Sequence, residues 1–417
     1  MDKFVVNGQN KLSGTVQISG AKNAVLPIMT ATLLTSGKSV LHNVPHLNDI
    51  KMMAYLLRVI GAKVDMEADT MSIDSTHCSY FEAPYELVSK MRASIYVLGP
   101  LLARFGQAKV SFPGGCAIGT RPVDLHLDAM RKLGAEIDIE HGYILAKSKK
   151  LVGTTIEFPK VSVGATANVL MAAVLAKGTT ILKNAAKEPE IGSLIEFLNL
   201  MGAKIKGKDT SVLEITGVSQ LQPAEMKMIP DRIETGTFMI AAAITGSEIK
   251  ITHTIPKLVA SLTNKLELAG VKIEQQHDSL HVLPNKKIIA VNISTQPYPG
   301  FPTDLQAQFM ALMCLAEGTS KIEENIFPDR FMHVAELKRL DADIQVTKNL
   351  AIIQGVPELS GAPVMATDLR ASAALVLAGL AAKGETVISR IYHIDRGYEK
   401  IEEKLQALGA DIKRVKG

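Results

Sequence analysis

The stretch TANVLMAAVLAKGTTILKNA, residues 166–185, decides the fold of this chain. Its first eleven residues are apolar on nearly every side, which is typical of a helix that is buried all round. A lysine and a glycine follow, and a glycine directly after a helix suits the left-handed C-cap position. The residues TTILK then predict a short strand. The stretch therefore predicts a buried helix, a glycine cap and a strand in immediate succession.

The same succession recurs six times along the chain. A glycine before a strand appears in SGKSVLHNV, FGQAKVSFP, KGTTILKNA, GSEIKITHT, EGTSKIEEN and KGETVISRI, and an apolar run of helical length precedes each. A second landmark follows 23 to 28 residues later in IGAKVD, LGAEID, MGAKIK, AGVKIE, LDADIQ and LGADIK. Successive second landmarks lie 68 to 73 residues apart. Two landmarks that recur at nearly constant separations indicate a true internal repeat.

Each repeat predicts strand, buried helix, glycine, strand, amphipathic helix, glycine and strand, so the fold class is α/β. A chain of 417 residues exceeds one hydrophobic core, and we expect two closed domains of three repeats rather than a solenoid. The division is predicted near residues 228–231, where Pro230 breaks the pattern. Residues 12–18 echo the strands that open later repeats, and the repeats leave open which domain this strand joins. A chain that crosses twice would leave a cleft, where ligands usually bind.

Composition excludes several classes of protein. Apolar residues make up 47% of the chain, aromatic residues 5%, and tryptophan is absent, which suits aliphatic helices packed on sheets. The net charge of +4 comes from 46 basic and 42 acidic residues that are scattered, so no nucleic-acid partner is expected. No apolar segment reaches the length of a membrane span, and the first residues lack a signal core. We therefore expect no membrane partner and a cytoplasmic location.

The three cysteines, Cys78, Cys116 and Cys314, form no C-x-x-C pair, which excludes a disulfide framework and a cysteine zinc site. The ten histidines form no metal-binding pair, so we expect no metal and no cofactor. Cys78 and Cys314 are expected to be small buried side chains. Cys116 lies in the glycine-rich stretch PGGCAIGTRPVD, residues 113–124, which predicts a mobile loop. Arg121 would favour its reactive thiolate there, and its role stays open between nucleophile, proton donor and redox sensor.

Four of the six apolar helices begin with a cation, although the N-terminal end of a helix already carries partial positive charge. These cations are Lys22, Arg92, Arg232 and Arg370. Free N–H groups together with lysine or arginine form strong phosphate or carboxylate sites, so the repeated placement predicts a polyanionic ligand. For Asp304 and Asp368, each after a threonine and before an apolar run, an ordinary N-cap is the alternative. No P-loop or dinucleotide-binding glycine motif is present.

Ten motifs spread over the whole chain resemble the enolpyruvyl transferases that act on UDP-N-acetylglucosamine in peptidoglycan synthesis. They are SGAKNA, MRAS, PGGCAIGTRPVDLH, KVSVGAT, AAKEPEI, PDRIETGTF, FPTDLQAQ, ENIFPDRFMH, ATDLRAS and YHIDRGYE. The resemblance implies transfer of the enolpyruvyl group of phosphoenolpyruvate to the 3-hydroxyl of the sugar, with release of phosphate, by addition and elimination. It implies two inside-out, barrel-like α/β domains, each of three βαβαββ repeats around buried parallel helices. Residues 22–229 would form one domain, residues 1–21 with 230–417 the other, and the active site would lie in the cleft between them.

The resemblance also implies residue roles. Cys116, on a loop at about residues 112–122, would protonate phosphoenolpyruvate, form a pyruvate phosphothioketal adduct and be alkylated by fosfomycin. Asp304 would be the base, with Lys22 and Arg396 also catalytic. Phosphoenolpyruvate would be bound by Lys22, Asn23, Arg121, Arg370 and Arg396. UDP-N-acetylglucosamine would be bound by Asn23, Arg92, Arg121, Pro122, Val123, Asp124, Leu125, Lys160, Ser162, Val163, Gly164, Asp304, Ile326 and Phe327. Supporting residues would be Glu188, Asp231, Arg330 and Asp368.

Three other interpretations stay open. The sister enolpyruvyl transferase acting on shikimate 3-phosphate would share the fold, but its members lack the PGGC loop. A protein that binds UDP-N-acetylglucosamine without catalysis is a second alternative, and a structural repeat scaffold with no ligand is a third. The sequence leaves the oligomeric state open, a monomer included.

Overall fold

The structure is a computed structural model that describes residues 2–112 and 123–416. The described chain divides into two compact units. The middle unit comprises residues 20–112 and 123–229, and the terminal unit comprises residues 2–19 and 230–416. Each unit has its own hydrophobic core, and no core residue of one unit belongs to the core of the other.

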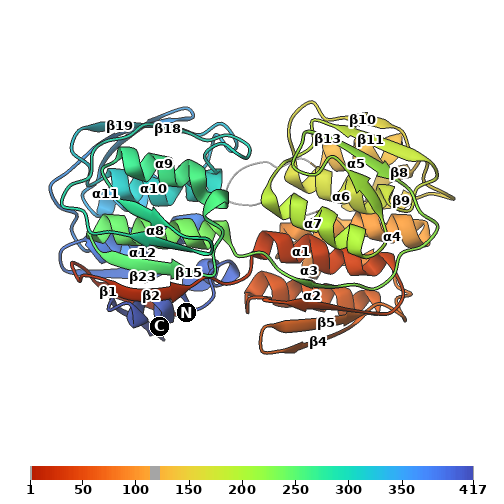
Figure 1. The fold of residues 1–417 in the computed structure, drawn as a ribbon, viewed down its shortest axis with the longest axis horizontal. Helices are drawn as coiled ribbons and strands as arrows, with labels where there is room; N and C mark the ends of the chain where they lie inside the picture. Colours follow the sequence, from red (N-terminus) through yellow and green to blue (C-terminus); the bar gives the residue numbers. More distant parts are fainter. Residues whose placement is uncertain (1, 113–122, 417) are drawn as a thin grey trace. The chain divides into compact units, whose positions relative to one another are not determined.

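Each unit is built around three helices that are buried on nearly every side, as the apolar runs predict. They are α1 (Lys22–Ala31), α4 (Leu98–Phe105) and α6 (Val163–Ala173) in the middle unit, and α8 (Arg232–Thr245), α10 (Gln306–Met313) and α12 (Leu369–Ala381) in the terminal unit. Every residue of α10 is buried. In the terminal unit the three helices pack against one another (Figure 1). This explains why their sequences have no polar face.

One buried helix begins later than its apolar run predicts. The run ASIYVLGPLLA starts in the 3-10 helix η2 (Arg92–Val97), and the α-helix α4 starts only at Leu98. Pro100 is the third residue of α4. Proline lacks an N–H group and is tolerated in the first turn of an α-helix but not in its interior. Pro100 therefore lies in the first turn of α4, where a proline is tolerated.

Three four-stranded sheets cover the helices of each unit, and all six sheets have the same order. A leading strand pairs in parallel with the strand that follows the buried helix, and that strand pairs antiparallel with the first of two further antiparallel strands. These two strands form a hairpin in five sheets and are β1 (Lys3–Asn7) and β24 (Asp411–Val415), from the two ends of the chain, in the sixth. The middle unit has β14 (Glu225–Lys227), β3 (Lys38–His42), β5 (Thr70–Asp74) and β4 (Lys63–Glu67); β6 (Glu82–Ala83), β7 (Gln107–Ser111), β9 (Tyr143–Lys147) and β8 (Glu136–Glu140); and β10 (Thr155–Glu157), β11 (Thr179–Lys183), β13 (Val212–Thr216) and β12 (Lys204–Lys206).

The terminal unit repeats this order. Its sheets are β2 (Ser13–Gln17), β15 (Glu248–Thr252), β17 (Ser279–Val282) and β16 (Ile273–Gln275); β18 (Ile293–Ser294), β19 (Thr319–Glu323), β21 (Leu350–Gln354) and β20 (Asp343–Thr347); and β22 (Pro363–Met365), β23 (Glu385–Ser389), β1 (Lys3–Asn7) and β24 (Asp411–Val415). The repeat is therefore βαβαββ, with one strand more than the landmarks alone predict and the strand count that the family resemblance implies.

The landmark residues adopt the left-handed backbone that a helix C-cap needs. All twelve have positive φ: Gly37, Gly61, Gly106, Gly134, Gly178, Gly202, Gly246, Gly270, Gly318, Asp341, Gly384 and Gly409. Asp341 replaces the expected glycine in one repeat and still has φ of 67°. Aspartate and asparagine tolerate this region better than most residues do. The predicted helix end is confirmed at Gly106, at Gly246 and at the six second landmarks. It is wrong for Gly37, Gly178, Gly318 and Gly384, because the buried helix before each of them ends several residues earlier and the glycine lies just before the strand instead.

The N-terminal strands join the terminal unit, the point that the repeats left open. β2 pairs in parallel with β15, in register from Ser13 opposite Glu248 to Gln17 opposite Thr252. β1 lies between β23 and β24 and completes the last sheet, beside segments almost 400 residues away in sequence (Figure 1). The strand that leads the first repeat is instead β14, which pairs with β3.

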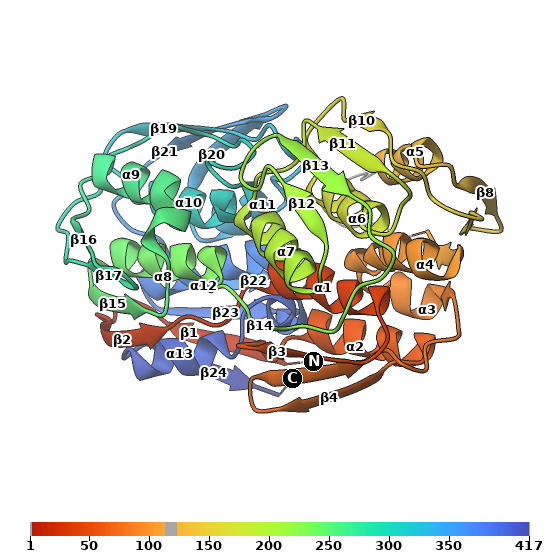
Figure 2. The same ribbon diagram turned by 45° about the vertical axis from the view of Figure 1, so that its right-hand side comes forward.

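Six amphipathic helices lie between these strands (Figure 2). They are α2 (Asn48–Ile60), α5 (Asp124–Lys132), α7 (Pro189–Leu200), α9 (Ala260–Leu268), α11 (His333–Arg339) and α13 (Ile401–Ala407). Within residues 2–112 and 123–416, no helix has the length and apolar character that a bilayer crossing requires.

Candidate active site

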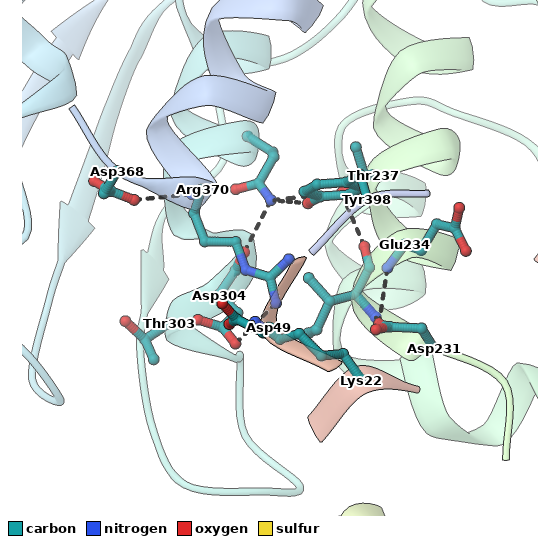
Figure 3. A network of polar contacts seen from close by, with 12 residues as sticks. Lys22, Asp49, Asp231, Glu234, Thr237, Thr303, Asp304, Asp368, Arg370 and Tyr398 are labelled. Atoms are coloured by element: carbon teal, nitrogen blue, oxygen red, sulfur yellow. Dashed lines mark hydrogen bonds and ion pairs between the residues drawn. The ribbon is translucent and has the colours of Figure 1, made fainter. Parts of the chain in front are cut away.

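In the terminal unit, the carboxylate of Asp304 lies between two arginines that come from different elements. Asp304 belongs to the single 3-10 turn η4 (Thr303–Leu305), which leads directly into α10. Its Oδ1 accepts a hydrogen bond from Nη1 of Arg330 at 2.9 Å. Its Oδ2 accepts one from Nη2 of Arg370 at 3.2 Å, and Figure 3 shows Asp304 beside Arg370. The side chain caps neither helix, so the N-cap alternative is wrong for Asp304.

The two arginines determine the charge state of this site. Their side chains are only 5% and 4% exposed, and that of Asp304 is 28% exposed. Burial by itself would raise the pKa of Asp304, but the charges of Arg370 and Arg330 outweigh burial and hold the pKa well below its usual range. Burial would lower the pKa of Arg370, and the Asp304 carboxylate raises it above its usual value instead. Carboxylate and guanidinium are therefore both charged at neutral pH.

A fully buried glutamate, Glu324, organises the segment next to Asp304. Its Oε1 accepts the N–H groups of Ile326 and Phe327 at 2.9 and 3.0 Å, and its Oε2 accepts the hydroxyl of Thr303 at 2.9 Å. Thr303 in turn accepts a hydrogen bond from Arg330 at 3.0 Å. Glu324 thus connects the predicted sugar-binding pair, Ile326 and Phe327, to the turn that carries Asp304.

Arg370 is held from two sides at the start of α12. Asp368 is the N-cap of this helix, and its carboxylate accepts the N–H of Arg370 at 2.8 Å, so the N-cap alternative is correct for Asp368. The guanidinium of Arg370 lies 5.4 Å from the ring centre of Tyr398, close enough for a cation–π contact. The Tyr398 hydroxyl hydrogen-bonds Thr237 at 2.8 Å and Gln308 at 3.1 Å (Figure 3).

The remaining predicted residues of the terminal unit lie at helix ends. Arg396 is the last residue of the 3-10 helix η5 (Ile391–Arg396) and is half-buried, two residues before Tyr398. Asp231 is the N-cap of α8, where its carboxylate accepts the N–H groups of Ile233 and Glu234 at 2.8 and 3.1 Å. A helix-capping role thus accounts for the burial of Asp231.

In the middle unit, Lys22 forms a buried ion pair. It is the first residue of α1, and its Nζ lies 3.2 Å from Oδ2 of Asp49, which sits in the first turn of α2. The two side chains are 9% and 8% exposed. Asn23 follows Lys22 on α1 and is half-buried. The cation that the sequence places against the helix dipole is therefore balanced by a carboxylate from the next helix.

Two predicted sugar-binding segments meet in the middle unit. Ser162 caps α6 by accepting the N–H of Ala165 at 3.3 Å, and Val163 and Gly164 begin the helix. His126 of α5 packs against this helix start, because a Cβ at Gly164 would lie 3.1 Å from its imidazole. The Nδ1 of His126 accepts a hydrogen bond from the amide of Asn168 at 2.8 Å. The segments that contain RPVDLH and KVSVGAT therefore touch at this point.

His126 is neutral at physiological pH. Burial and, to a smaller extent, the positive charge of Arg92 lower its pKa to about 4. A neutral imidazole accepts at one nitrogen and donates at the other, so the bond from Asn168 to Nδ1 leaves the proton on Nε2. That N–H lies at the start of α6, where free backbone N–H groups also favour an anion.

The other predicted residues of the middle unit are less enclosed or lie outside the described part. Val123 is buried just before α5, Asp124 is exposed and Leu125 half-buried on its first turn, and Lys160 is exposed. Arg92 begins η2, and Glu188 occupies the N-cap position of α7. Cys116, Arg121 and Pro122 lie outside the described residues.

The two described cysteines are buried, as predicted. Cys78 is 7% exposed and Cys314 is fully buried. Burial raises the pKa of Cys314 to about 12, so this thiol stays protonated and inert. Among residues 2–112 and 123–416, no group of three or more His, Cys, Asp or Glu side chains is arranged to hold a metal ion.

Sequence reasoning missed five residues that shape the site: Asp49, His126, Gln308, Glu324 and Tyr398. Four of them lie inside motifs that point to the family, namely His126 in PVDLH, Gln308 in FPTDLQAQ, Glu324 in ENIF and Tyr398 in RGYE. A buried polar residue inside a functional motif was the available signal. For Asp49 the sequence offers no such signal.

Comparisons with known proteins agree on one family. The sequence model of the family described as EPSP synthase (3-phosphoshikimate 1-carboxyvinyltransferase) matches residues 6–405. The UDP-N-acetylglucosamine 1-carboxyvinyltransferase of Trichlorobacter lovleyi is 58% identical over 416 residues, covering 100% of this chain and 99% of the relative. The protein of the same name from Geobacter metallireducens is 56% identical and is covered completely, as is this chain.

Solved structures extend the comparison to the fold. The enolpyruvyl transferase NikO from Streptomyces tendae is similar with a TM-score of 0.90 at 26% identity, covering 100% of this chain and 99% of that one. EPSP synthase from Acinetobacter baumannii has a TM-score of 0.77 at 16% identity, with both chains fully covered. At that identity the likeness concerns the fold alone.

Proposed function

This chain belongs to the EPSP synthase family of enolpyruvyl transferases, and from that premise we propose how its residues carry out the reaction. The chain transfers the enolpyruvyl group of phosphoenolpyruvate to the 3-hydroxyl of UDP-N-acetylglucosamine and releases phosphate, a step of peptidoglycan synthesis. The observation that carries this conclusion is the identity of 54–58% over the whole chain to relatives that are all named for this reaction. The sister reaction on shikimate 3-phosphate has support only from the family description and from structures at 16% identity.

The chemistry needs one acid and one base. In the addition step the sugar oxygen bonds to C2 of phosphoenolpyruvate while C3 takes up a proton, and the hydroxyl proton leaves to a base. The product is a tetrahedral intermediate that still carries the phosphate. In the elimination step C3 loses a proton and the C2–O bond to phosphate breaks, which restores the double bond. A positioned base contributes about 10²–10⁴-fold to the rate of such a proton transfer.

Asp304 is the proposed base for the sugar hydroxyl. Its pKa is held low by Arg370 and Arg330, so the carboxylate is ionised and able to accept a proton, although it is a weak base in that state. Phosphoenolpyruvate is an anion and would draw the Arg370 guanidinium toward itself. Asp304 would then lose part of its stabilising charge, its pKa would rise, and it would become a stronger base when the substrate is bound.

The proposed contacts to the two anionic substrates include the cations that lie at helix starts. Lys22, Asn23, Arg121, Arg370 and Arg396 bind the phosphate and carboxylate of phosphoenolpyruvate, and Cys116 delivers the proton to C3. The nucleotide sugar is bound by Arg92, residues 121–125, Lys160, residues 162–164, Ile326 and Phe327. The start of α6, with its Ser162 cap and the neutral His126 beside it, suits the diphosphate, because free N–H groups there favour anions.

We place the reaction in the cytoplasm, because both substrates are phosphorylated anions that do not cross a lipid bilayer unaided. Oligomeric assembly is not required by any of these roles.

The test is release of phosphate by the purified chain with both substrates, with each substrate omitted in turn, and with shikimate 3-phosphate in place of the nucleotide sugar. We expect release only with UDP-N-acetylglucosamine and phosphoenolpyruvate together. Release with shikimate 3-phosphate would identify the sister activity. No release, with the nucleotide sugar still bound in a calorimetric titration, would identify a non-catalytic binding protein.

Variants then test the roles. We expect Asp304→Asn to lower kcat by about 10²–10⁴-fold and Asp329→Asn, an exposed aspartate nearby in the same unit, to leave it unchanged. Cys116→Ser should abolish proton delivery, and fosfomycin should inactivate the parent chain but not label this variant. Full turnover by Cys116→Ser would contradict the proposed proton donor.

A further inference from the structure

Arg396 sits on a segment that cannot hold its position alone. It ends η5 (Ile391–Arg396), a 3-10 helix of six residues. The segment is bounded by Arg390 and Lys400, which have φ of 58° and 46°. Hydrogen bonds in 3-10 helices have poor geometry, and runs beyond three or four residues are uncommon. Contacts from other elements must therefore fix where the Arg396 side chain is presented.

The residue next to Arg396 is held by an arginine from the C-terminal strand. Asp395 accepts two hydrogen bonds from Arg414 of β24, from Nη2 to Oδ1 at 2.6 Å and from Nη1 to Oδ2 at 3.1 Å. The third nitrogen, Nε of Arg414, donates to Oε1 of Glu402 on α13 at 2.6 Å. The guanidinium also lies 5.1 Å from the ring centre of Phe4, its partner across the β1–β24 ladder. One side chain thus ties η5, α13 and both terminal strands together.

The residues that follow Arg396 in the sequence are held by hydrogen bonds to other elements of the terminal unit. Tyr398 is fixed by hydrogen bonds to Thr237 of α8 and Gln308 of α10. Glu399 accepts the hydroxyl of Ser19, which follows β2, at 2.7 Å. Asp395, Tyr398 and Glu399 therefore bracket Arg396 with contacts to separate elements of the terminal unit, and the Asp395 contact is the one on its N-terminal side.

The type of contact points to positioning rather than to stability. The side chains of Arg414 and Asp395 are 29% and 27% exposed, and partly exposed ion pairs contribute little net stability. A bidentate arginine–carboxylate pair, however, fixes both distance and orientation of the carboxylate. A lysine in the same place would supply the charge without the planar fork. The geometry therefore selects an arginine for its shape.

We propose that Arg414 is a positioning residue for phosphoenolpyruvate binding: its bidentate pair with Asp395 fixes the segment that presents Arg396 to the anionic substrate. This inference rests on the proposed role of Arg396 in binding phosphoenolpyruvate. It assigns a function in substrate binding to β24, the last strand of the chain.

The experiment compares steady-state kinetics of Arg414→Gln, Asp395→Asn, the double variant and Arg414→Lys. The matched control is Lys413→Gln, the neighbour on the opposite face of β24, whose Nζ lies 3.5 Å from Asp411. Arg396→Gln is measured in parallel to test the parent proposal. Assays run well below each thermal midpoint, with the dissociation constant of UDP-N-acetylglucosamine measured by calorimetry.

We expect Arg414→Gln to raise KM for phosphoenolpyruvate by about tenfold, a fraction of the hundredfold that a misplacement of about 1 Å can cost. The turnover number and the affinity for the nucleotide sugar should change by less than about twofold. The double variant should be no worse than the worse single variant, because both remove the same contact. Arg414→Lys should recover only part of the loss, and Lys413→Gln should behave like the parent chain.

Each contrary result has its own meaning. If Arg396→Gln raises KM and Arg414→Gln does not, the positioning role is wrong while the proposed function stands. If Arg396→Gln leaves KM unchanged, the proposed role of Arg396 fails and the inference fails with it. Equal losses for Arg414→Gln and Lys413→Gln, or independent losses that add in the double variant, would mean that Arg414 acts through general charge or stability and would overturn the inference.

Discussion

Single residues set the chemistry of the Asp304 site, because this carboxylate is held in the ionised form by Arg370 and Arg330 against the effect of burial. We expect Arg330→Met to raise the pKa of Asp304, since it removes one cation and leaves the burial. A base works only when ionised, so the variant should lose kcat/KM as pH falls through the range of ordinary carboxylates. The parent chain should show no such loss from Asp304. The measurement is a pH–rate profile between about pH 4.5 and 8.

The matched control is Arg339→Met. It removes an exposed arginine of α11 whose Nε lies 3.9 Å from Oε2 of Glu336. Its profile should follow that of the parent chain. Loss of activity by Arg330→Met to the same extent at every pH would contradict the electrostatic role. Arg330 would then act by holding Asp304 in place, through Thr303 and the carboxylate itself.

Motifs located the charged residues of the site but not their partners. Lys22 and Arg370 could be named from the sequence, because cations at helix starts are unusual, and Asp304 could be named through the family resemblance. Asp49 could not, because it meets Lys22 only after α1, β3 and α2 have packed. The partners of Glu324 could not be named either, because its four hydrogen bonds come from segments on both sides of it in the sequence. Which residues contact these side chains depends on the tertiary structure, and no local sequence pattern encodes it.

This fold also places cations near helix ends for structural reasons. At the end of the first buried helix, the guanidinium of Arg104 donates to the carbonyl oxygens of Leu33, Thr35 and Ser75 at 2.6 to 3.2 Å. In the terminal unit, Lys11 donates to the carbonyls of Thr245 and Gly246 at the end of α8. Lys11 thus satisfies carbonyls at the C-terminal end of α8 and complements the negative end of its dipole. Arg104 satisfies carbonyls of residues that follow α1 and of Ser75, which follows β5.

We expect Arg104→Met to lower the free energy of unfolding by about 3 kcal/mol, because it leaves buried carbonyl oxygens without donors. Chemical denaturation followed by circular dichroism measures this change. Arg131→Met is the control, since Arg131 forms an exposed pair with Asp128 on α5 and its loss should cost less than about 0.5 kcal/mol. An equal loss in both variants would show that the carbonyl contacts of Arg104 add nothing.

The elements themselves were predictable to different degrees. The buried helices followed from the apolar runs, but only two of the six, α4 and α8, are capped by the predicted glycine. Asp341 keeps the left-handed backbone of the glycine it replaces. The fourth strand of each repeat was not predicted from the residues, because hairpin strands such as β13 contain neither of the two glycine landmarks that define the repeat. The 3-10 start of the second buried helix was not predicted, because an apolar run does not distinguish a 3-10 helix from an α-helix.

At the scale of the whole chain, two leading strands are exchanged between distant repeats. β2 near the N-terminus leads the repeat of α8, and β14 at residues 225–227 leads the repeat of α1. Both strands are short and pair in parallel with equivalent partners, so the repeat pattern fits either assignment. Only the pairing in three dimensions decides it, which is why the sequence predicts the number of repeats but not the path of the chain.

Each unit also contains one buried, neutral histidine, and together these couple the stability of the chain to pH. His126 in the middle unit and His333 in the terminal unit are 7% and 1% exposed. Burial lowers the pKa of both to about 4, against an ordinary value of 6.5. The charge of Arg92 adds to this for His126, whereas at His333 Asp368 opposes the effect and Arg330 adds to it.

Between about pH 6.5 and 4 the unfolded chain therefore binds more protons at these two residues than the folded chain does. Stability must fall as pH falls through this window, by up to about 3 kcal/mol for each histidine. We expect the thermal midpoint of the parent chain to drop between pH 7 and 4.5, and the drop to shrink in His126→Asn and in His333→Gln and to shrink further in the double variant. His77→Asn, at an exposed position, should leave the drop unchanged. If the thermal midpoint of the double variant drops as much as that of the parent chain, the sensitivity to acid comes from the carboxylates instead. The pH response of the two units would then arise at their surfaces rather than in their cores.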